Sequence, residues 1–281
     1  MIYKTVFKCL LIALCCMACT VQKNVQTLTI LHTNDTHSQV EPLEEGKRDA
    51  FCAGYARRMG MVEQIRKTNP NLILLDAGDY SQGTPYFNFY HGRIEIDAMN
   101  RMHYDAITLG NHEFDYGVDT LATILKMAKF PIVCANYDVT GSALDSLVKP
   151  YTIITRGELR IGVFGLGIDP SGLISEKNFF PLRYLDPVNA AQNVADKLKN
   201  EENCHLVICL SHQGTDPSTE GKISDTELAN ETRNIDIIIG AHTHKVVENR
   251  YVKNLDGKDV LLTQVGKSGA RIGEIIVQIG K

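Results

Sequence analysis

Short apolar runs alternate with amphipathic segments along most of the chain. Short runs rich in apolar residues predict strands at 28–32, 72–75, 106–109, 132–135, 206–210 and 235–239, and the run at 72–75 is apolar throughout. Between them, apolar residues at helical spacing predict helices at 54–67, 93–103, 118–129 and 187–198. Strands that alternate with helices are typical of a layered α/β fold in which both faces of each sheet are covered.

The pattern changes in the middle and at the end of the chain. Segments 151–155 and 160–165 predict a β-hairpin across the turn "RGE". Strand-like segments at 246–252, 260–264 and 272–279 follow the last helix, with the turn "NLDGKD" between the first two. We expect these three segments to form an antiparallel sheet that closes the fold.

The first residues have the pattern of a targeting segment. Lys4 and Lys8 precede an apolar run at 10–18, which is too short to span a bilayer and fits a secretory signal peptide. The step from Ala18 to Cys19 resembles a bacterial lipoprotein cleavage site, although Cys16 stands where leucine is usual. We therefore expect a signal peptide at 1–18, a tether at 19–27 and one domain at 28–281. The protein would then be exported to the periplasm or cell envelope, with membrane contact only through a lipid on Cys19; cleavage without lipidation is the alternative.

The composition and net charge of the chain limit the kinds of molecule that it is expected to bind. The chain has 281 residues, of which 44% are hydrophobic and 22% charged, enough for one large domain with a full core. The formal net charge is −4, and loss of Lys4 and Lys8 with the signal peptide would make the chain more acidic. This argues against a nucleic-acid partner, because neutralising phosphates takes clustered Lys and Arg. An anionic small substrate would need a local source of positive charge.

Five polar stretches follow predicted strands: "NDTH" (34–37), "DAGD" (76–79), "GNHEFD" (110–115), "SHQG" (211–214) and "GAHTH" (240–244). In α/β sheets the carboxyl ends of strands are where ligands bind. Two pairs within these stretches are spaced two residues apart, so in extended segments each pair would point to one side. The candidate donors are Asp35, His37, Asp79, Asn111, His212, His242 and His244.

Seven donors are too many for one metal ion but suit two, provided that one carboxylate bridges them. Asp79 lies between the two groups in sequence and is the natural bridge. Imidazole and carboxylate without thiolate suit Zn²⁺, Mn²⁺ or Fe²⁺. Two such ions about 3.5–4 Å apart stabilise the attacking and leaving oxygens of a displacement at phosphorus. They would also supply the positive charge that the acidic chain lacks.

The five stretches resemble those of the calcineurin-like metallophosphoesterases, and within them the bacterial 5'-nucleotidase and UDP-sugar hydrolase family. "ILHTNDTHS", "LLDAGDYSQGTP", "GNHEFDYG", "LSHQGTD" and "IIIGAHTHK" match that family's blocks in its order, between residues 28 and 280. The resemblance implies a four-layer α-β-β-α fold with two central mixed β-sheets flanked by helices. It also implies a dinuclear phosphoesterase, with a nucleoside 5'-monophosphate as the first expected substrate.

Carried over residue by residue, the resemblance implies one metal on Asp35, His37, Asp79 and His244 and another on Asp79, Asn111, His212 and His242. It implies that His112 is not a ligand but faces the phosphoryl group, and that Asp115 orients His112 and keeps it protonated. Two further polar residues are expected to have no part in the chemistry: Asn34 would only shape its loop, and Asp76 would be structural. Alternation would direct Glu113 away from His112.

One feature of the family is not expected here. Many members carry a C-terminal domain that binds the nucleoside, and we expect this domain to be absent from the chain and supplied by a separate polypeptide. Other functions stay open at this point: a phosphodiesterase for 2',3'-cyclic nucleotides or UDP-sugars, a sulfur-ester hydrolase like the related thiosulfohydrolases, or a non-catalytic binding lipoprotein.

Overall fold

A computed structural model describes residues 25–217 and 222–280 of the chain. The expected signal peptide, Cys19 and most of the expected tether lie outside these residues. Within the described ranges, every helix is too short or too polar to cross a membrane.

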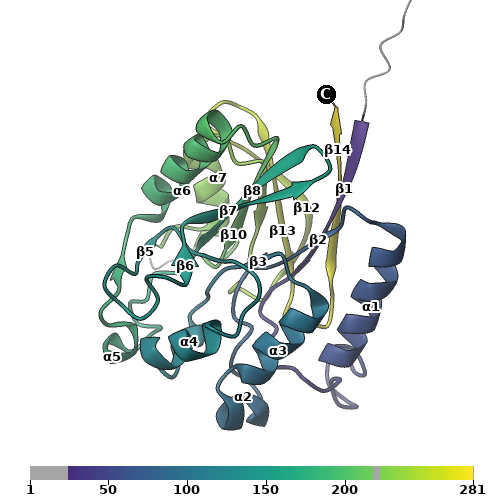
Figure 1. The fold of residues 1–281 in the computed structure, drawn as a ribbon, viewed down its shortest axis with the longest axis vertical. Coiled ribbons are helices and arrows are strands. Elements are labelled where there is room, and N and C mark those ends of the chain that lie inside the picture. The colour runs from purple at the N-terminus through teal and green to yellow at the C-terminus, as the bar shows by residue number, and fades with distance from the viewer. Residues whose placement is uncertain (1–24, 218–221, 281) are drawn as a thin grey trace, which may run out of the picture.

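Two six-stranded sheets lie at the centre of the fold (Figure 1). The first has the order β14 (Gly273–Gly280), β1 (Val25–Thr33), β2 (Ile73–Asp76), β3 (Ala106–Ile107), β4 (Ile132–Val133) and β6 (Val148–Lys149). The second has the order β12 (Val246–Lys253), β13 (Asp259–Val265), β11 (Ile237–Ile239), β10 (Leu206–Ser211), β8 (Leu159–Leu166) and β7 (Tyr151–Arg156). Only β14, β12 and β7 run antiparallel to their neighbours, so both sheets are mixed.

Helices cover the outer face of each sheet (Figure 1). The first sheet packs against α1 (Tyr55–Thr68), α3 (Arg93–Met102) and α4 (Val118–Leu125), and the second against α6 (Pro187–Asp196) and α7 (Asp225–Glu231). The short elements between them are α2 (Pro85–Tyr90), a 3₁₀ turn (His112–Phe114), β5 (Tyr137–Asp138), α5 (Glu176–Phe179), β9 (Arg183–Tyr184) and a π turn (Lys197–Glu201). The four-layer fold that the resemblance implied is confirmed.

The central strands are rich in apolar residues because each one separates two cores. In β1, Leu31 packs toward the helices, whereas Leu28 and Ile30 pack between the two sheets. In β2, Leu74 faces the helices and its neighbours face the other sheet. Successive side chains of a strand point to opposite faces, and here both faces are dry.

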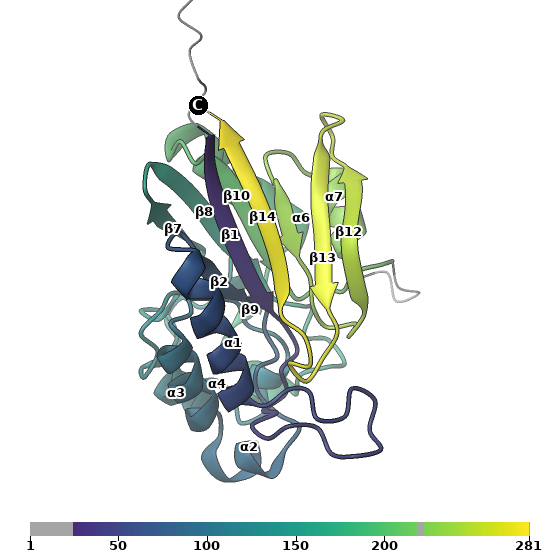
Figure 2. The same ribbon diagram turned by 90° about the vertical axis from the view of Figure 1, so that its right-hand side faces the viewer.

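The prediction of one antiparallel sheet for the tail is wrong in part. β12 and β13 pair antiparallel across their turn, as expected. β14, however, leaves them and pairs antiparallel with β1 in the first sheet, from Val25 opposite Gly280 to His32 opposite Gly273 (Figure 2). β1 would otherwise present a long unpaired edge, and β14 satisfies its backbone N–H and C=O groups. The predicted hairpin of β7 and β8 is confirmed.

Candidate metal centre

All seven predicted donors lie in loops that follow β1, β2, β3, β10 and β11. The structure brings them together at the carboxyl ends of these strands, although they come from five separate parts of the chain. Three groups have ligand atoms within 4.8 Å of one another: Asp35, His37 and His244; Asp79, His212 and His242; and His37, Asp79 and His112.

Two of these groups correspond to the two predicted ligand sets. In the first, the Nε2 atoms of His37 and His244 are 2.9 Å apart, and His244 Nε2 lies 3.6 Å from Asp35 Oδ1. In the second, His212 Nε2 lies 3.1 Å from Asp79 Oδ2. Each set therefore offers imidazole nitrogens and a carboxylate oxygen that point at the same place.

Asn111 and Asp79 complete the arrangement. Asn111 Oδ1 lies 3.2 Å from His242 Nδ1, which places the amide oxygen beside the second set. Asp79 belongs to the second set and also to the group with His37, so its carboxylate lies between the two sets. This is the position that a bridging ligand requires.

The ligand pairs converge in a way that the sequence did not predict. An extended segment was expected, but Asp35, His37, His242 and His244 have φ values of 47°, 45°, 68° and 55°. This left-handed region is sparsely populated by non-glycine residues, although Asp and His are among those enriched in it. Asp79, with φ of 55°, shares it. Most of the candidate ligands thus have a strained backbone conformation.

Two glycines allow the loops to approach closely. A Cβ atom on Gly78, whose φ is 90°, would lie 2.6 Å from the backbone nitrogen of Gly110. A Cβ atom on Gly110 would lie 2.2 Å from Asp79 Oδ1 and 2.6 Å from His212 Cε1. A larger residue at position 110 would displace the Asp79 and His212 side chains, and one at position 78 would displace the backbone at Gly110.

The protonation states of the histidines fit metal binding. Burial lowers the pKa of His37 and of His242 to about 4, so at neutral pH both imidazoles are uncharged and have a free lone pair. His212 is different: burial opposes its protonation, but Asp79 and Asp35 raise its pKa to about 10. Its Nδ1 lies 2.8 Å from the carbonyl oxygen of Ala77, which fixes Nε2 toward the carboxylates.

The carboxylates show why a cation is needed here. Burial raises the pKa of Asp35 to about 7, despite the opposing influence of His212. Burial alone would also raise the pKa of Asp79, but His212 holds it below its usual range. The carboxylates of Asp35 and Asp79 are almost inaccessible to solvent, so a buried positive charge must balance their negative charge. In the absence of metal, a proton on His212 supplies that charge. The donor set fits divalent cations, which would replace that proton.

His112 and Asp115 lie at the edge of this cluster. His112 Nδ1 is 3.1 Å from Asp115 Oδ2, and the His112 and His37 ring centroids are 5.5 Å apart. Burial opposes protonation of His112, but Asp115 and Asp79 outweigh it and raise its pKa above the usual value. The His112 side chain is 31% exposed, which leaves it accessible to a ligand at the metal centre.

Glu113 is a site residue that sequence reasoning missed. Residues His112–Phe114 form a 3₁₀ turn, so the alternation argument that directed Glu113 away does not apply. Its buried carboxylate accepts hydrogen bonds from the backbone N–H groups of Asp79 (3.0 Å), Ser81 (3.0 Å) and Gly110 (2.6 Å). Glu113 thus joins the loop that carries Asp79 to the loop that carries Asn111 and His112. The sequence signal was a Glu directly after two site residues.

Asn34 and Gln264 hold Asp35 in a similar way. Asn34 Nδ2 donates to Asp35 Oδ2 at 2.6 Å, and Asn34 Oδ1 accepts from the backbone N–H of Val265. Gln264 Nε2 lies 3.5 Å from the same carboxylate. These contacts tie Asp35 to the end of β13. Asp76 was expected to be structural, and it accepts hydrogen bonds from the hydroxyl of Thr33 and the backbone N–H of Gly78.

Comparison with known proteins matches most of the chain to one protein family. The calcineurin-like phosphoesterase family model matches residues 28–246, which is most of the chain. The human 5'-nucleotidase is 37% identical over 242 residues, which cover 83% of this chain and 40% of that protein. A snake venom 5'-nucleotidase from Naja atra is 38% identical over 226 residues, which cover 77% of this chain and 41% of that protein.

Comparison with solved structures also finds similarity to nucleotidases. A 5'-nucleotidase precursor from Thermus thermophilus superposes with a TM-score of 0.80 at 32% identity, over 91% of this chain and 54% of that one. The NAD nucleotidase of Haemophilus influenzae superposes with a TM-score of 0.79 at 28% identity, over 92% and 49% of the two chains. The chain thus spans about half the length of these four relatives, or less.

Proposed function

Because this chain belongs to the calcineurin-like phosphoesterase family, we propose that it hydrolyses phosphate monoesters, with nucleoside 5'-monophosphates as the preferred class. The observation that carries this proposal is the pair of ligand sets on either side of Asp79. The similarity to proteins named 5'-nucleotidase supports the substrate class. The proposed enzyme is a metal-dependent hydrolase that acts on phosphate esters.

We assign the ligands as follows. One divalent ion would be held by Asp35, His37, Asp79 and His244, and a second by Asp79, Asn111, His212 and His242. Nitrogen and oxygen donors without thiolate favour Mn²⁺, Zn²⁺ or Fe²⁺. When bound, the two ions would supply Lewis-acid activation of the phosphoryl oxygens and lower the pKa of the attacking water.

We propose that His112 contacts the phosphoryl group. A protonated imidazole at the edge of the cluster can stabilise negative charge that develops on phosphoryl oxygens and can donate a proton to the leaving oxygen. Asp115 fixes the tautomer and orientation of His112 by accepting from Nδ1, which leaves Nε2 free to face the substrate. Glu113 acts indirectly, because it positions the backbone that carries Asp79 and His112.

A further proposal concerns the setting of the enzyme. We propose that Cys19 is lipidated and anchors the protein to the cell envelope, on the basis of the lysines and short apolar run that precede it.

The test is metal analysis combined with a substrate panel. Purified protein should hold up to two transition-metal ions per chain and should hydrolyse AMP and other nucleoside monophosphates when Mn²⁺ is added. Excess EDTA should abolish this hydrolysis. Undiminished activity in EDTA with no bound metal would refute the two-metal proposal. Hydrolysis of 2',3'-cyclic nucleotides or UDP-sugars, but not of monophosphates, would instead identify a phosphodiesterase.

A further inference from the structure

A residue from the second half of the chain contacts the end of the turn that carries His112. Asn178, in α5, donates from Nδ2 to the backbone carbonyl oxygen of Asp115 at 2.9 Å. It also packs beside Gly117, because the three atoms nearest to a Cβ built on that glycine all belong to Asn178, at 3.7–3.9 Å. Asn178 therefore contacts both the residue that pairs with His112 and the residue that begins α4.

The residue after Asn178 packs against the same turn. The ring centroids of Phe179 and Phe114 are 5.3 Å apart, and the ring of Tyr137 lies 5.0 Å from the first and 5.7 Å from the second. All three rings are almost fully buried. Since Phe114 is the last residue of the 3₁₀ turn, this aromatic cluster joins the turn to α5.

The segment that carries Asn178 is itself fixed on both sides. After α5, β9 pairs antiparallel with β5, and the backbone N–H of Leu185 donates to the carbonyl oxygen of Asn136 at 2.8 Å. Before α5, the carbonyl oxygen of Ile168 accepts from the hydroxyl of Tyr137 at 2.6 Å. Because both flanks of α5 are bonded to the same short segment around β5, α5 can serve as a rigid support.

The side chains of His112 and Asp115 need such a support. They are 31% and 36% exposed, so packing holds them only in part. The beginning of the turn is fixed by the backbone N–H of His112, which donates to Asp79 Oδ1 at 2.9 Å. Its end is fixed by the bond from Asn178 to the carbonyl oxygen of Asp115. The direction of the His112 ring therefore depends on both ends of the turn.

We propose that Asn178 is a positioning residue for the pair His112 and Asp115. By fixing the backbone of Asp115, it keeps the carboxylate on Nδ1 of His112 and directs the other ring nitrogen at the phosphoryl group. This inference rests on the role proposed above for His112. Small displacements of a group that contacts the transition state lower the rate strongly, even when the displaced group is intact. Loss of Asn178 should therefore lower turnover, although Asn178 does not contact the substrate.

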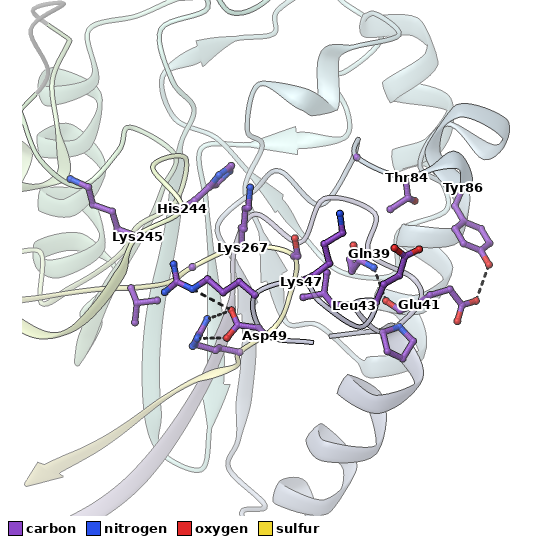
Figure 3. Close-up of a pocket in the computed structure, with 18 of the residues that line it drawn as sticks. Gln39, Glu41, Leu43, Lys47, Asp49, Thr84, Tyr86, His244, Lys245 and Lys267 are labelled. Carbon is purple, nitrogen blue, oxygen red and sulfur yellow. Dashed lines mark hydrogen bonds and ion pairs between the residues drawn. The ribbon is translucent and has the colours of Figure 1, made fainter. Parts of the chain in front are cut away.

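Asn178 lies away from the open side of the metal centre. A groove of about 1040 Å³ adjoins the centre at His244 (Figure 3). Its lining comes mainly from the segments that follow β1, β2, β11 and β13. Among the described residues, those at 167–186, which include Asn178, do not line it. A substitution at Asn178 should therefore leave access to the centre, and with it KM, unchanged.

The test is a double-mutant cycle on AMP hydrolysis by the Mn²⁺-loaded protein. Asn178→Leu keeps the branched shape of the side chain but removes the donor. We expect kcat to fall about fivefold, as for the loss of one neutral hydrogen bond, with KM and metal content unchanged. In a His112→Ala background the same substitution should change kcat less than twofold, because the ring that Asn178 positions is gone. Asn71→Leu is the matched control, since Asn71 is also half-buried but precedes β2, at the amino end of that strand.

A loss of equal size in both backgrounds would overturn the inference, as would wild-type kcat in Asn178→Leu. NMR of the Zn²⁺-loaded protein separates the inference from the proposed function. The Nδ1 proton of His112, identified by its absence in His112→Ala, should broaden or disappear in Asn178→Leu and persist in Asn71→Leu, whether or not the protein hydrolyses AMP. An unchanged resonance in Asn178→Leu would refute the positioning role. A changed resonance in a protein that hydrolyses no phosphate ester would support the positioning role and refute the proposed function alone.

Discussion

The substitution Glu113→Gln isolates the role of the buried carboxylate that joins two loops of the metal centre. Oε2 of Glu113 accepts from the backbone N–H groups of Asp79 and Gly110, and Oε1 accepts from that of Ser81. Glutamine keeps the size of the side chain but has only one acceptor oxygen. Its NH₂ group must therefore face a backbone N–H, whichever way the amide is turned.

The expected cost follows from this count. One buried N–H left without an acceptor costs about 1–3 kcal/mol, and the opposed donor of the glutamine amide adds to it. We expect a loss of at least about 2 kcal/mol in the free energy of unfolding. For a domain of this size that corresponds to a fall in Tm of about 4–8 °C. Burial raises the pKa of Glu113 to about 7, but the loss holds for either protonation state, because glutamine nitrogen cannot accept from Ser81.

Thermal unfolding and metal titration test this prediction together. Glu113→Gln should lower Tm in the metal-free protein and weaken Mn²⁺ binding, since Asp79 and the Asn111 turn lose their common support. Glu274→Gln is the matched control, because Glu274 is exposed on β14. A Glu113→Gln protein with wild-type Tm and wild-type metal affinity would refute the reasoning. A lower Tm with unchanged metal affinity would limit Glu113 to a structural role.

Four further predictions follow from the site and its surroundings. His112→Ala should lower kcat about 10²-fold or more with metal content retained, and Asp115→Asn should give a smaller loss; loss of metal from His112→Ala would show that its role is wrongly assigned. The chain alone should hydrolyse an aryl phosphate with kcat/KM within about tenfold of that for AMP, a gap of ~1.4 kcal/mol, because the phosphoryl contacts dominate; a strong preference for one nucleotide in a substrate panel would contradict this. Membrane fractionation should recover the wild type with membranes, whereas Cys19→Ser should stay uncleaved or become soluble, and N-terminal mapping should place the mature end at Cys19. Burial lowers the pKa of His32 from 6.5 to about 4, so its contribution to stability is present above pH 6.5 and is lost as the pH falls from 6.5 to 4. The loss amounts to about 3 kcal/mol. His32→Leu should flatten the curve of unfolding free energy against pH in that window, and a curve parallel to that of the wild type would contradict the assignment.

The strands and the donor residues could be predicted because their signals are local. A run such as Ile73–Leu75 can only be buried on both faces, and a polar stretch directly after it lies at a strand end. The position of β14 could not be predicted in this way. The pattern of hydrophobic and polar residues in β14 fits any half-buried edge strand of a sheet. Its partner β1 lies at the other end of the chain. Among the last three strands, the local pairing signal came from the "NLDGKD" turn between β12 and β13.

The same distinction explains what was missed at the site. The imidazoles and carboxylates are visible as residue types, and their spacing indicates that they act together. The supporting contacts of Glu113 and Asn34 join segments far apart in sequence, to Asp79 and to Val265, and they use backbone groups that carry no sequence signal. The left-handed conformations of Asp35 and His37 were hidden for a similar reason. Both residue types occur in many conformations, and only the neighbouring loops select one.

These loops also explain how strained ligand positions persist before any metal binds. A residue in a sparsely populated backbone region costs on the order of 1–3 kcal/mol, and five of the seven proposed ligands are in one. The loop after β1 is fixed to the loop after β2 by a ladder of backbone hydrogen bonds, from Asp35 N–H to Gly78 O (2.9 Å), His37 N–H to Asp79 O (3.0 Å) and Ser38 N–H to Tyr80 O (2.8 Å). This ladder continues the pairing of β1 with β2 beyond the strand ends. The strain is therefore offset by the fold, and an arriving ion would meet donors already in place instead of having to order them itself.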